Sequence, residues 1–153
     1  MTGAVDDEFM LLRWPTFVIA RRINCPVDTL ARALDTPGIL RRGTTIDLDN
    51  GDTLVLDGPF RESWCWPRSE WRTSGCLYQR RNRPVARVEL TVAAWSRDAS
   101  ELALRPVARH PERWSRRRTH RYFALAHNAA DGMTRRVRAV EVPRDSDRMS
   151  MFA

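Results

Sequence analysis

Lysine is absent from this sequence, so all 26 of its basic residues are arginines. Arginine codons are rich in G and C, and a base-composition bias of the source explains the choice of arginine over lysine without reference to function. The absence of lysine therefore does not by itself identify a partner. The distribution of the arginines along the chain is more informative.

Long apolar runs are missing as well. No stretch approaches the roughly 18 consecutive apolar residues that a membrane-spanning helix needs. The first eight residues include Asp6, Asp7 and Glu8, whereas a secretory signal begins with basic residues. From these two absences we expect neither a membrane span nor export, and we predict a cytoplasmic protein.

Cysteine and histidine are scarce and poorly placed for metal binding. The three cysteines, Cys25, Cys65 and Cys76, show no C-x-x-C spacing, which favours reduced thiols over a zinc or redox site. His120, His127 and Asp131 would share one face of a helix, and a fourth ligand is missing from the sequence around them. We therefore predict no metal and no cofactor.

Catalytic motifs are missing too. The sequence has no G-x-S-x-G, no phosphate-binding glycine loop, no G-x-G-x-x-G and no cysteine beside a histidine. Its candidate acids and bases, such as Glu62, Glu70 and Glu89, are scattered along sheet segments and do not form a pair. No catalytic residue can be named, and we favour a protein that is not an enzyme.

The composition is that of one globular domain. The chain has 153 residues, of which 42% are hydrophobic, and this is enough to bury a core. We divide it into a loose lead-in over 1–13, a single domain over 14–142 and a polar, disordered tail over 143–153. The pattern leaves open whether residues 133–142 continue the last helix.

The first predicted strand begins at Thr16 and ends at Ile23. It is rich in β-branched residues, and it places Phe17, Ile19, Arg21 and Ile23 on one face. A short amphipathic helix should follow after Pro26, because apolar residues recur with helical spacing at Val27, Leu30, Ala31 and Leu34.

A β-hairpin is predicted around Asn50-Gly51, a dipeptide that favours tight turns between alternating apolar runs. A two-residue loop there would set Asp47 opposite Leu54. Residues paired across an antiparallel ladder share a face, so this register would mix a charge with the core.

The other register gives the hairpin one clean apolar face. A three-residue loop with Gly51 in the left-handed conformation, a G1-bulge turn, would pair Leu48 with Leu54 and Ile46 with Leu56. We therefore predict this second register and a positive φ at Gly51.

Most of the remaining sheet is predicted in the second half. Over 60–66, strand alternation puts Phe60, Trp64 and Trp66 on one side. The clearest strand runs over 84–95 with Val88 and Leu90 inward, and residues 101–108 should be its antiparallel partner.

A long amphipathic helix ends the domain. We expect it to open at His110-Pro111-Glu112, with proline at the first helical position and an acid in the first turn. Its apolar residues fall on a single broad face of the helix: Trp114, Tyr122, Leu125, Ala126, Ala129, Met133 and Val137. The predicted class is thus α+β, with a curved antiparallel sheet gripping a long C-terminal helix.

This order of elements resembles the START-like, or SRPBCC, superfamily. The clearest stretch is the hairpin over 85–108 that leads into His110-Pro111-Glu112 and the helix behind it, and the general outline covers residues 16–137. The resemblance implies a cavity between sheet and helix that holds an apolar or aromatic small molecule. It also implies polyketide cyclase or aromatase activity as the enzymatic alternative.

If such a cavity exists, large aromatic side chains and the small residues of the helix stripe should line it. Arg21 shares its strand face with apolar residues and could meet a ligand carboxylate or phenolate there. The predicted ligand-binding residues are Arg21, Trp64, Trp66, Trp95, Tyr122, Ala126, Ala129 and Met133.

The competing interpretation uses the charge of the second half. Residues 1–60 hold six arginines against nine acids, whereas residues 80–121 hold twelve arginines against four. The runs Arg80-Arg81 and Arg116-Arg117-Arg118 suggest contacts to phosphates, in a module that binds nucleic acid or an acidic protein. A charge run is more often a solvated face, so this interpretation ranks second at the level of the sequence.

Overall fold

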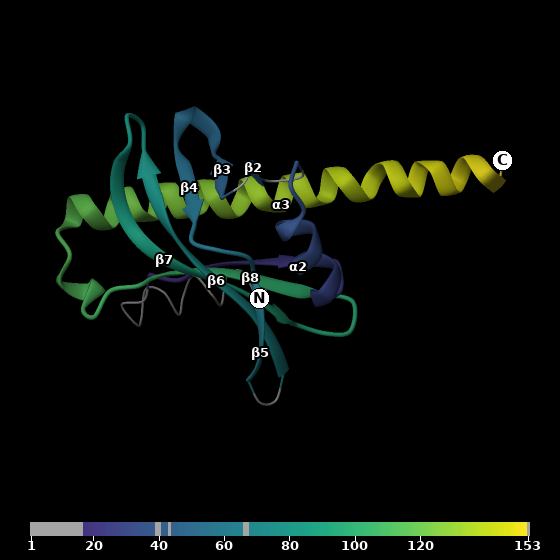
Figure 1. Ribbon diagram of the computed structural model, residues 1–153, viewed down its shortest axis with the longest axis horizontal. Helices are drawn as coiled ribbons and strands as arrows, with labels where there is room; N and C mark the ends of the chain where they lie inside the picture. The colour runs from purple at the N-terminus through teal and green to yellow at the C-terminus, as the bar shows by residue number, and fades with distance from the viewer. Residues whose placement is uncertain (1–16, 39–40, 43, 66–67, 153) are drawn as a thin grey trace, which may run out of the picture.

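The computed structural model describes residues 17–38, 41–42, 44–65 and 68–152, with side chains followed along the last helix as far as Arg138. Figure 1 shows a curved antiparallel sheet with a long helix laid along one side of it. The predicted α+β class, a curved sheet gripping a long C-terminal helix, is confirmed.

Eight strands and two α-helices make up the described fold, together with two short 3₁₀ turns. In chain order they are β1 (Ile19–Ile23), α2 (Val27–Asp35), β2 (Arg41–Arg42), β3 (Thr45–Asp47), η1 (Asp49–Gly51), β4 (Thr53–Leu56), β5 (Arg61–Cys65), β6 (Arg68–Gln79), β7 (Arg83–Ala94), β8 (Ser100–Pro106), η2 (Pro111–Arg113) and α3 (Arg116–Phe152).

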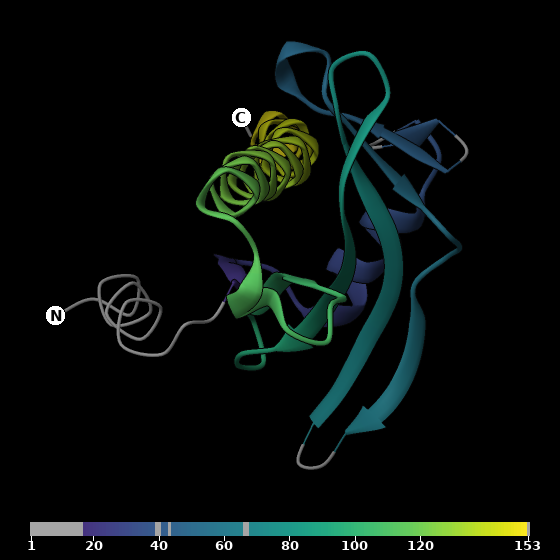
Figure 2. The ribbon, with the colours of Figure 1, turned by 90° about the vertical axis from the view of Figure 1, so that its left-hand side faces the viewer.

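The sheet is antiparallel throughout, in the order β1-β8-β7-β6-β4-β3-β2, and β5 pairs separately with β6. The first strand therefore lies beside the last one, with Ile19 opposite Leu104. Strands β6 and β7 are the longest at 12 residues each, and Figure 2 shows them bending around α3.

The core lies between the concave face of the sheet and α3. Val88, Leu90 and Val92 of β7 are all wholly buried, as their alternation predicted. On α3 the buried side chains follow a helical stripe: Tyr122, Leu125, Ala126, Ala129, Ala130, Met133 and Val137. Helix α2 contributes Leu30 and Leu34 and packs against β7, β8 and α3.

The β3–β4 hairpin keeps its predicted apolar face, but its predicted pairing is wrong. Ile46 lies opposite Leu54, and the backbone N–H of Leu48 donates to the carbonyl of Asp52 over 2.8 Å. The predicted register differed by two residues, and a shift of two returns each side chain to the same side of the sheet. For this reason Ile46, Leu48, Leu54 and Leu56 are still all buried.

The turn of this hairpin confirms the left-handed glycine. Gly51 has a φ of 82° and its neighbour Asn50 a φ of 65°. Three residues lie between Leu48 and Asp52, as predicted. Positive φ at Asn50 as well as Gly51 differs from the predicted G1-bulge turn, in which a type I turn precedes a single left-handed residue.

We expect Gly51→Ala to lower the free energy of unfolding by about 1 kcal/mol, because an alanine there must hold the left-handed conformation. Space is not the cause, since an added Cβ would lie 3.7 Å from the nearest atom, Cγ of Arg80. Urea unfolding measures the change. Gly58→Ala is the control, as Gly58 has an ordinary φ and open space around it. Equal losses in both variants would contradict the assignment.

The long helix begins later than predicted. Pro111 opens only the 3₁₀ turn η2, after which Trp114 is extended, with a φ of −63° and a ψ of 148°. Ser115 then caps α3, since its Oγ accepts the N–H of Arg118 over 3.1 Å. Proline and an acid are favoured at the start of any helical turn. The sequence pattern at 111 and 112 therefore could not distinguish a short 3₁₀ turn from the start of the long helix.

Beyond the core contacts, the backbone of α3 is helical through residues 133–142 and on to Phe152. The stretch that the sequence left open is therefore helix. The lead-in over 1–13 lies outside the described residues, and the disorder expected for 143–153 in solution stays a prediction. Among the described residues no helix has both the length and the apolar character to cross a membrane.

Candidate functional site

Half of the predicted ligand-binding residues lie together, but within packed core. Tyr122, Ala126 and Ala129 expose none of their surface, and Met133 exposes 1%. The Tyr122 hydroxyl donates to the carbonyl of Leu104 over 3.3 Å, and burial raises the pKa of its phenol above the usual range. These four side chains join α3 to the sheet.

The tryptophans of the predicted site do not gather around these residues. Trp64 and Trp95 are 69% and 51% exposed, and Trp66 lies outside the described residues. Trp64 belongs to the β5–β6 hairpin, which extends past the rest of the sheet (Figure 2). Trp95 is covered on one face by the guanidinium of Arg22, 3.7 Å from the ring centre. Trp64 lies on a projecting hairpin, and Trp95 follows the last residue of β7. The alternation of residues does not show where these strands end, so it did not predict the exposure of the two side chains.

Arg21 faces α3, as its strand position predicted, but it binds protein groups there. Its Nε donates to Oδ1 of Asp131 over 2.9 Å, and an Nη lies 2.7 Å from Nδ1 of His127. A guanidinium can only donate, so Nδ1 of His127 is the acceptor in this contact. Arg21 thus ties β1 to α3.

Neither of the two surface pockets described here is lined by any of the eight predicted residues. One, of about 400 Å³, lies beside Glu89 and the end of β8, next to Arg105 and Arg109. The other, of about 440 Å³, lies between two hairpin turns and includes Arg80 and Arg83. Arginine side chains line both pockets, so the basic residues are the next candidates for a functional site.

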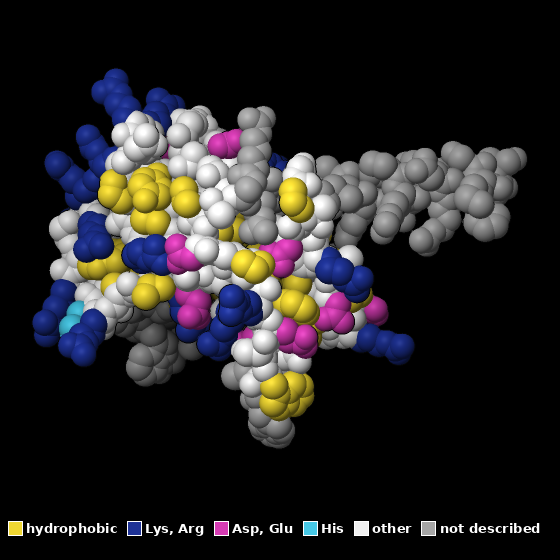
Figure 3. Space-filling model, viewed as in Figure 1, with side chains coloured by type: hydrophobic (Ala, Val, Ile, Leu, Met, Phe, Trp, Pro, Cys, Tyr) yellow, Lys and Arg dark blue, Asp and Glu magenta, His cyan; other side chains and the backbone are white. Residues whose placement is uncertain are grey.

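Ten arginines gather at one end of the molecule, which we call the arginine-rich end. They come from the β6–β7 turn, from the end of β8 with the segment that follows it, and from the first turns of α3. Figure 3 shows basic side chains along this end, and Figures 1 and 2 both place the three segments there. The ten are Arg80, Arg81, Arg83, Arg105, Arg109, Arg113, Arg116, Arg117, Arg118 and Arg121.

Few acidic side chains lie near them: Glu89 of β7 lies opposite Arg105, and Asp52 lines a pocket with Arg80 and Arg83. Over 80–83 and 105–121 the sequence has one acidic residue, Glu112. Its own backbone amide and then His110 lower the pKa of its carboxyl, and His110 lies 3.1 Å from it. Within the described part of the chain, none of the ten arginines forms an ion pair with an acidic side chain.

Some arginines elsewhere in the fold do have acidic partners. Arg87, on the outer face of β7, pairs with Asp57, and this hydrogen bond together with one from Ser74 lowers the pKa of the Asp57 carboxyl. Arg72 pairs in the same way with Glu70 over 2.6 Å. Arg21, Arg72 and Arg87 thus have acidic partners, but Arg22, Arg32, Arg61 and Arg97 have none among the described residues either. What distinguishes the arginine-rich end is the number of arginines gathered there.

Three of the ten stand where they disfavour folding. Arg116, Arg117 and Arg118 occupy the first turn of α3, which contains no acidic residue. The amino end of a helix carries a partial positive charge, so each cation there costs stability, typically 0.3–1 kcal/mol when exposed. Fold stability does not explain Arg116 and Arg117, whereas a bound anion would interact favourably with both the helix end and these arginines.

The backbone conformation of Arg81 also lowers the stability of the fold. Arg81 has a φ of 66° and is followed by Asn82 with a φ of 57°, so two successive residues of the β6–β7 turn are left-handed. A side chain with a Cβ is strained in this conformation, and arginine has no local hydrogen bond of the kind that helps asparagine adopt it. Strained residues tend to occur at functional sites.

We expect Arg81→Gly to raise the free energy of unfolding by up to about 1 kcal/mol, because glycine adopts positive φ without steric strain. Thermal or urea unfolding measures this gain. Arg83→Gly is the matched control, since it removes the same side chain from the regular strand β7 and should destabilise. A loss of stability in Arg81→Gly would contradict the claim that Arg81 is strained.

Two of the ten arginines, Arg118 and Arg121, are held close to the protein. The guanidinium of Arg118 lies 4.2 Å from the ring centre of Trp114, which itself stacks on Phe17. Nε of Arg121 is buried and has no hydrogen-bond partner among the described residues. A buried donor without an acceptor is costly, so Arg121 also lowers the stability of the fold.

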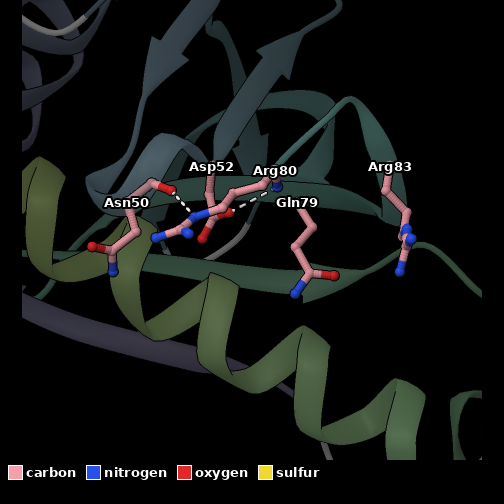
Figure 4. A pocket seen from close by; sticks show the side chains of 5 residues that line it. All are labelled: Asn50, Asp52, Gln79, Arg80 and Arg83. Carbon is pink, nitrogen blue, oxygen red and sulfur yellow. Dashed lines mark hydrogen bonds between the residues drawn. The ribbon is translucent and has the colours of Figure 1, made fainter.

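The larger pocket lies between the β3–β4 and β6–β7 turns, and we call it the two-turn pocket. It is lined by Asn50, Asp52, Gln79, Arg80 and Arg83. Arg80 spans it, because its backbone N–H donates to Oδ1 of Asp52 over 3.1 Å and its Nε donates to the carbonyl of Asn50. Figure 4 shows the side chains of Gln79 and Arg83 pointing to the same side of the turns.

The arginine runs are evident in the sequence, whereas this pocket was not predicted. Each turn had its own pattern, Asn50-Gly51 in one and Arg80 to Arg83 in the other. Their proximity depends on β4 pairing with β6, with Thr53 opposite Tyr78, which is a tertiary contact. No group of three metal-ligating side chains close enough to hold a metal ion occurs in the described part of the chain.

Comparison with known proteins does not assign the chain to a family. No protein-family model matches it, and no curated protein matches it significantly.

Proposed function

We propose that this protein binds the phosphate backbone of nucleic acid with its arginine-rich end. The observation that carries the proposal is the gathering of ten arginines, without acidic partners among the described residues, on three segments of one end. Phosphates are the ligands that arginine forks bind best, through paired charge-assisted hydrogen bonds.

The placement of individual arginines supports a role in binding. Arg116 and Arg117 oppose the dipole of α3, and Arg81 is strained, so these residues lower stability in the free protein. Residues retained at a cost to stability are expected where they contribute to function. The same positions would become favourable once a polyanion lies across the end.

The resemblance to the START-like superfamily supports a second candidate, carriage of an apolar or aromatic molecule between sheet and helix, with cyclase-type catalysis as its enzymatic form. The observation in its favour is the curved sheet around a long helix that carries Ala126, Ala129 and Ala130. It ranks second because these residues are buried in the core cluster and two of the predicted tryptophans point to solvent.

A direct comparison of the two ligand classes tests the proposal. Fluorescently labelled thymidine oligonucleotides of about 12 nucleotides are titrated with protein at about 50 mM salt and followed by anisotropy. A hydrophobic dye is titrated in parallel and followed by tryptophan quenching. We expect saturable oligonucleotide binding and little dye binding. Dye binding without oligonucleotide binding would overturn the proposal in favour of the carrier.

A cytoplasmic location belongs to the same proposal. It is supported by the spacing of the three cysteines in the sequence, which shows no C-x-x-C pair and favours reduced thiols. Nucleic acid is also a partner of the kind met in that compartment.

A further inference from the structure

We infer that the two-turn pocket receives one unpaired nucleobase of a single-stranded nucleic acid, and that guanine is the base that fits its polar groups. This inference rests on the proposed function, because the arginines around the pocket would hold the phosphates on either side of that base. It adds a preference for single strands and a base preference, neither of which follows from a basic surface.

The lining of the two-turn pocket does not suit a phosphate. Asp52 places a carboxylate in the pocket beside Arg80 and Arg83, and a carboxylate repels a phosphate group. A neutral, flat heterocycle with both donors and acceptors has no such conflict. The volume of about 440 Å³ lies in the range of small-molecule sites and exceeds what a single base requires.

The pocket offers donors and acceptors that the protein does not use. The guanidinium of Arg83 and the side-chain amides of Asn50 and Gln79 form no hydrogen bond with any described residue. Asp52 uses Oδ1 for the backbone N–H of Arg80, and a carboxylate can accept further hydrogen bonds. A ligand can therefore gain hydrogen bonds here without breaking existing ones.

The two turns are also held in place before any ligand arrives. Arg80 joins them through its bonds to Asp52 and to the carbonyl of Asn50 (Figure 4). Asn50 and Arg81 are both fixed in the left-handed conformation. A preorganised site loses less conformational entropy on binding, which favours a selective contact.

Guanine matches the two charged groups at once. Its Watson–Crick edge presents an N–H and an amino group, which can donate to the carboxylate of Asp52. Its O6 and N7 are the acceptors that an arginine such as Arg83 binds in a bidentate manner. In a duplex the Watson–Crick edge is already paired, so Asp52 could reach it only in a single strand.

The test uses thymidine oligonucleotides of about 12 nucleotides that carry one central guanine, adenine or cytosine, beside the all-thymidine strand and a duplex of the guanine strand. Binding is measured by anisotropy at a fixed salt concentration. We expect the guanine strand to bind at least about fivefold more tightly than the other strands, as one good base contact provides. The duplex should lose this advantage.

Asp52→Asn is the decisive variant. Its amide oxygen can still accept the N–H of Arg80, so the turn should be kept, but the amide cannot take both donors of guanine. We expect the guanine preference to disappear while affinity for the all-thymidine strand is equal or higher, because a negative charge has been removed. Asp98→Asn, which makes the same charge change in the exposed β7–β8 turn, should keep the preference.

The possible outcomes separate this inference from the function on which it rests. Equal binding of all four strands with a steep dependence on salt would overturn the base pocket and leave phosphate binding intact. A guanine preference that survives Asp52→Asn, or that Asp98→Asn also removes, would likewise overturn the pocket. No binding of any strand at low salt would overturn both.

Discussion

Replacing Arg113, Arg116 and Arg117 together by glutamine will weaken single-strand binding on the order of 10- to 100-fold at about 50 mM salt. All three are exposed and, in the described chain, none has an acidic partner. Each phosphate contact that is lost also removes about 0.7 from the slope of log affinity against log salt. The slope should therefore become shallower by roughly two if all three arginines touch phosphates.

The same variant should be slightly more stable than the native protein. Arg116 and Arg117 lie in the first turn of α3, where removing a cation relieves unfavourable interaction with the helix dipole by about 0.3–1 kcal/mol each. Weaker binding together with higher stability separates a binding role from a structural one. A variant that binds more weakly and is also less stable than the native protein would show that these arginines support the fold.

The control for this experiment removes the same charge elsewhere. Arg32, Arg61 and Arg97 are exposed on α2, on β5 and in the β7–β8 turn, away from the arginine-rich end (Figure 1). Their combined replacement by glutamine should leave the salt slope nearly unchanged. Equal effects in the two triple variants would mean that overall charge, and not this end, attracts the nucleic acid.

Gly75→Ala will be the most destabilising of the glycine substitutions, at about 1–3 kcal/mol. Gly75 is buried in β6, opposite Leu56 of β4 and Val88 of β7. A Cβ built there would lie 2.4 Å from the backbone oxygen of Val55 and 3.2 Å from Cα of Leu56. Both atoms belong to the main chain, so β4 must move away from β6 to accept even a methyl group.

Gly132→Ala provides a comparison of opposite sign. Gly132 lies within α3, and the only atom near an added Cβ is an Nη of Arg135, 3.9 Å away. Alanine is favoured over glycine inside a helix by up to about 1 kcal/mol, so this variant should be stabilised. Chemical denaturation of both variants measures the difference. If Gly75→Ala unfolds at the native midpoint, the close approach of β4 to β6 is not a constraint.

Local patterns were sufficient to predict most of the fold. The alternation of Val88, Leu90 and Val92 needs only sheet periodicity, and the stripe through Tyr122, Ala126 and Met133 of α3 needs only helical periodicity. Strand β6 was not recognised as a central strand, because its concave side carries Ser69, Trp71, Thr73 and Gly75 and thus lacks an apolar repeat. The β3–β4 pairing was wrong because a shift of two residues preserves every buried face.

The candidate site was harder to predict, because it depends on which segments meet. Arg21 was assigned to the correct face of β1, but its partners His127 and Asp131 lie more than a hundred residues away along the chain. The runs at 80–83 and 116–118 were visible in the sequence, whereas their location at one end follows from the curvature of the sheet and the path of α3.

The salt dependence of single-strand binding by the native protein tests the central claim most directly. Affinity for the all-thymidine oligonucleotide is measured by anisotropy at several salt concentrations between about 50 and 200 mM. The arginine-rich end predicts a straight line of log affinity against log salt with a negative slope of about 0.7 for each phosphate bound, and hence of several units in total. Affinity that does not change over this range, or no binding at its lower limit, would contradict the account.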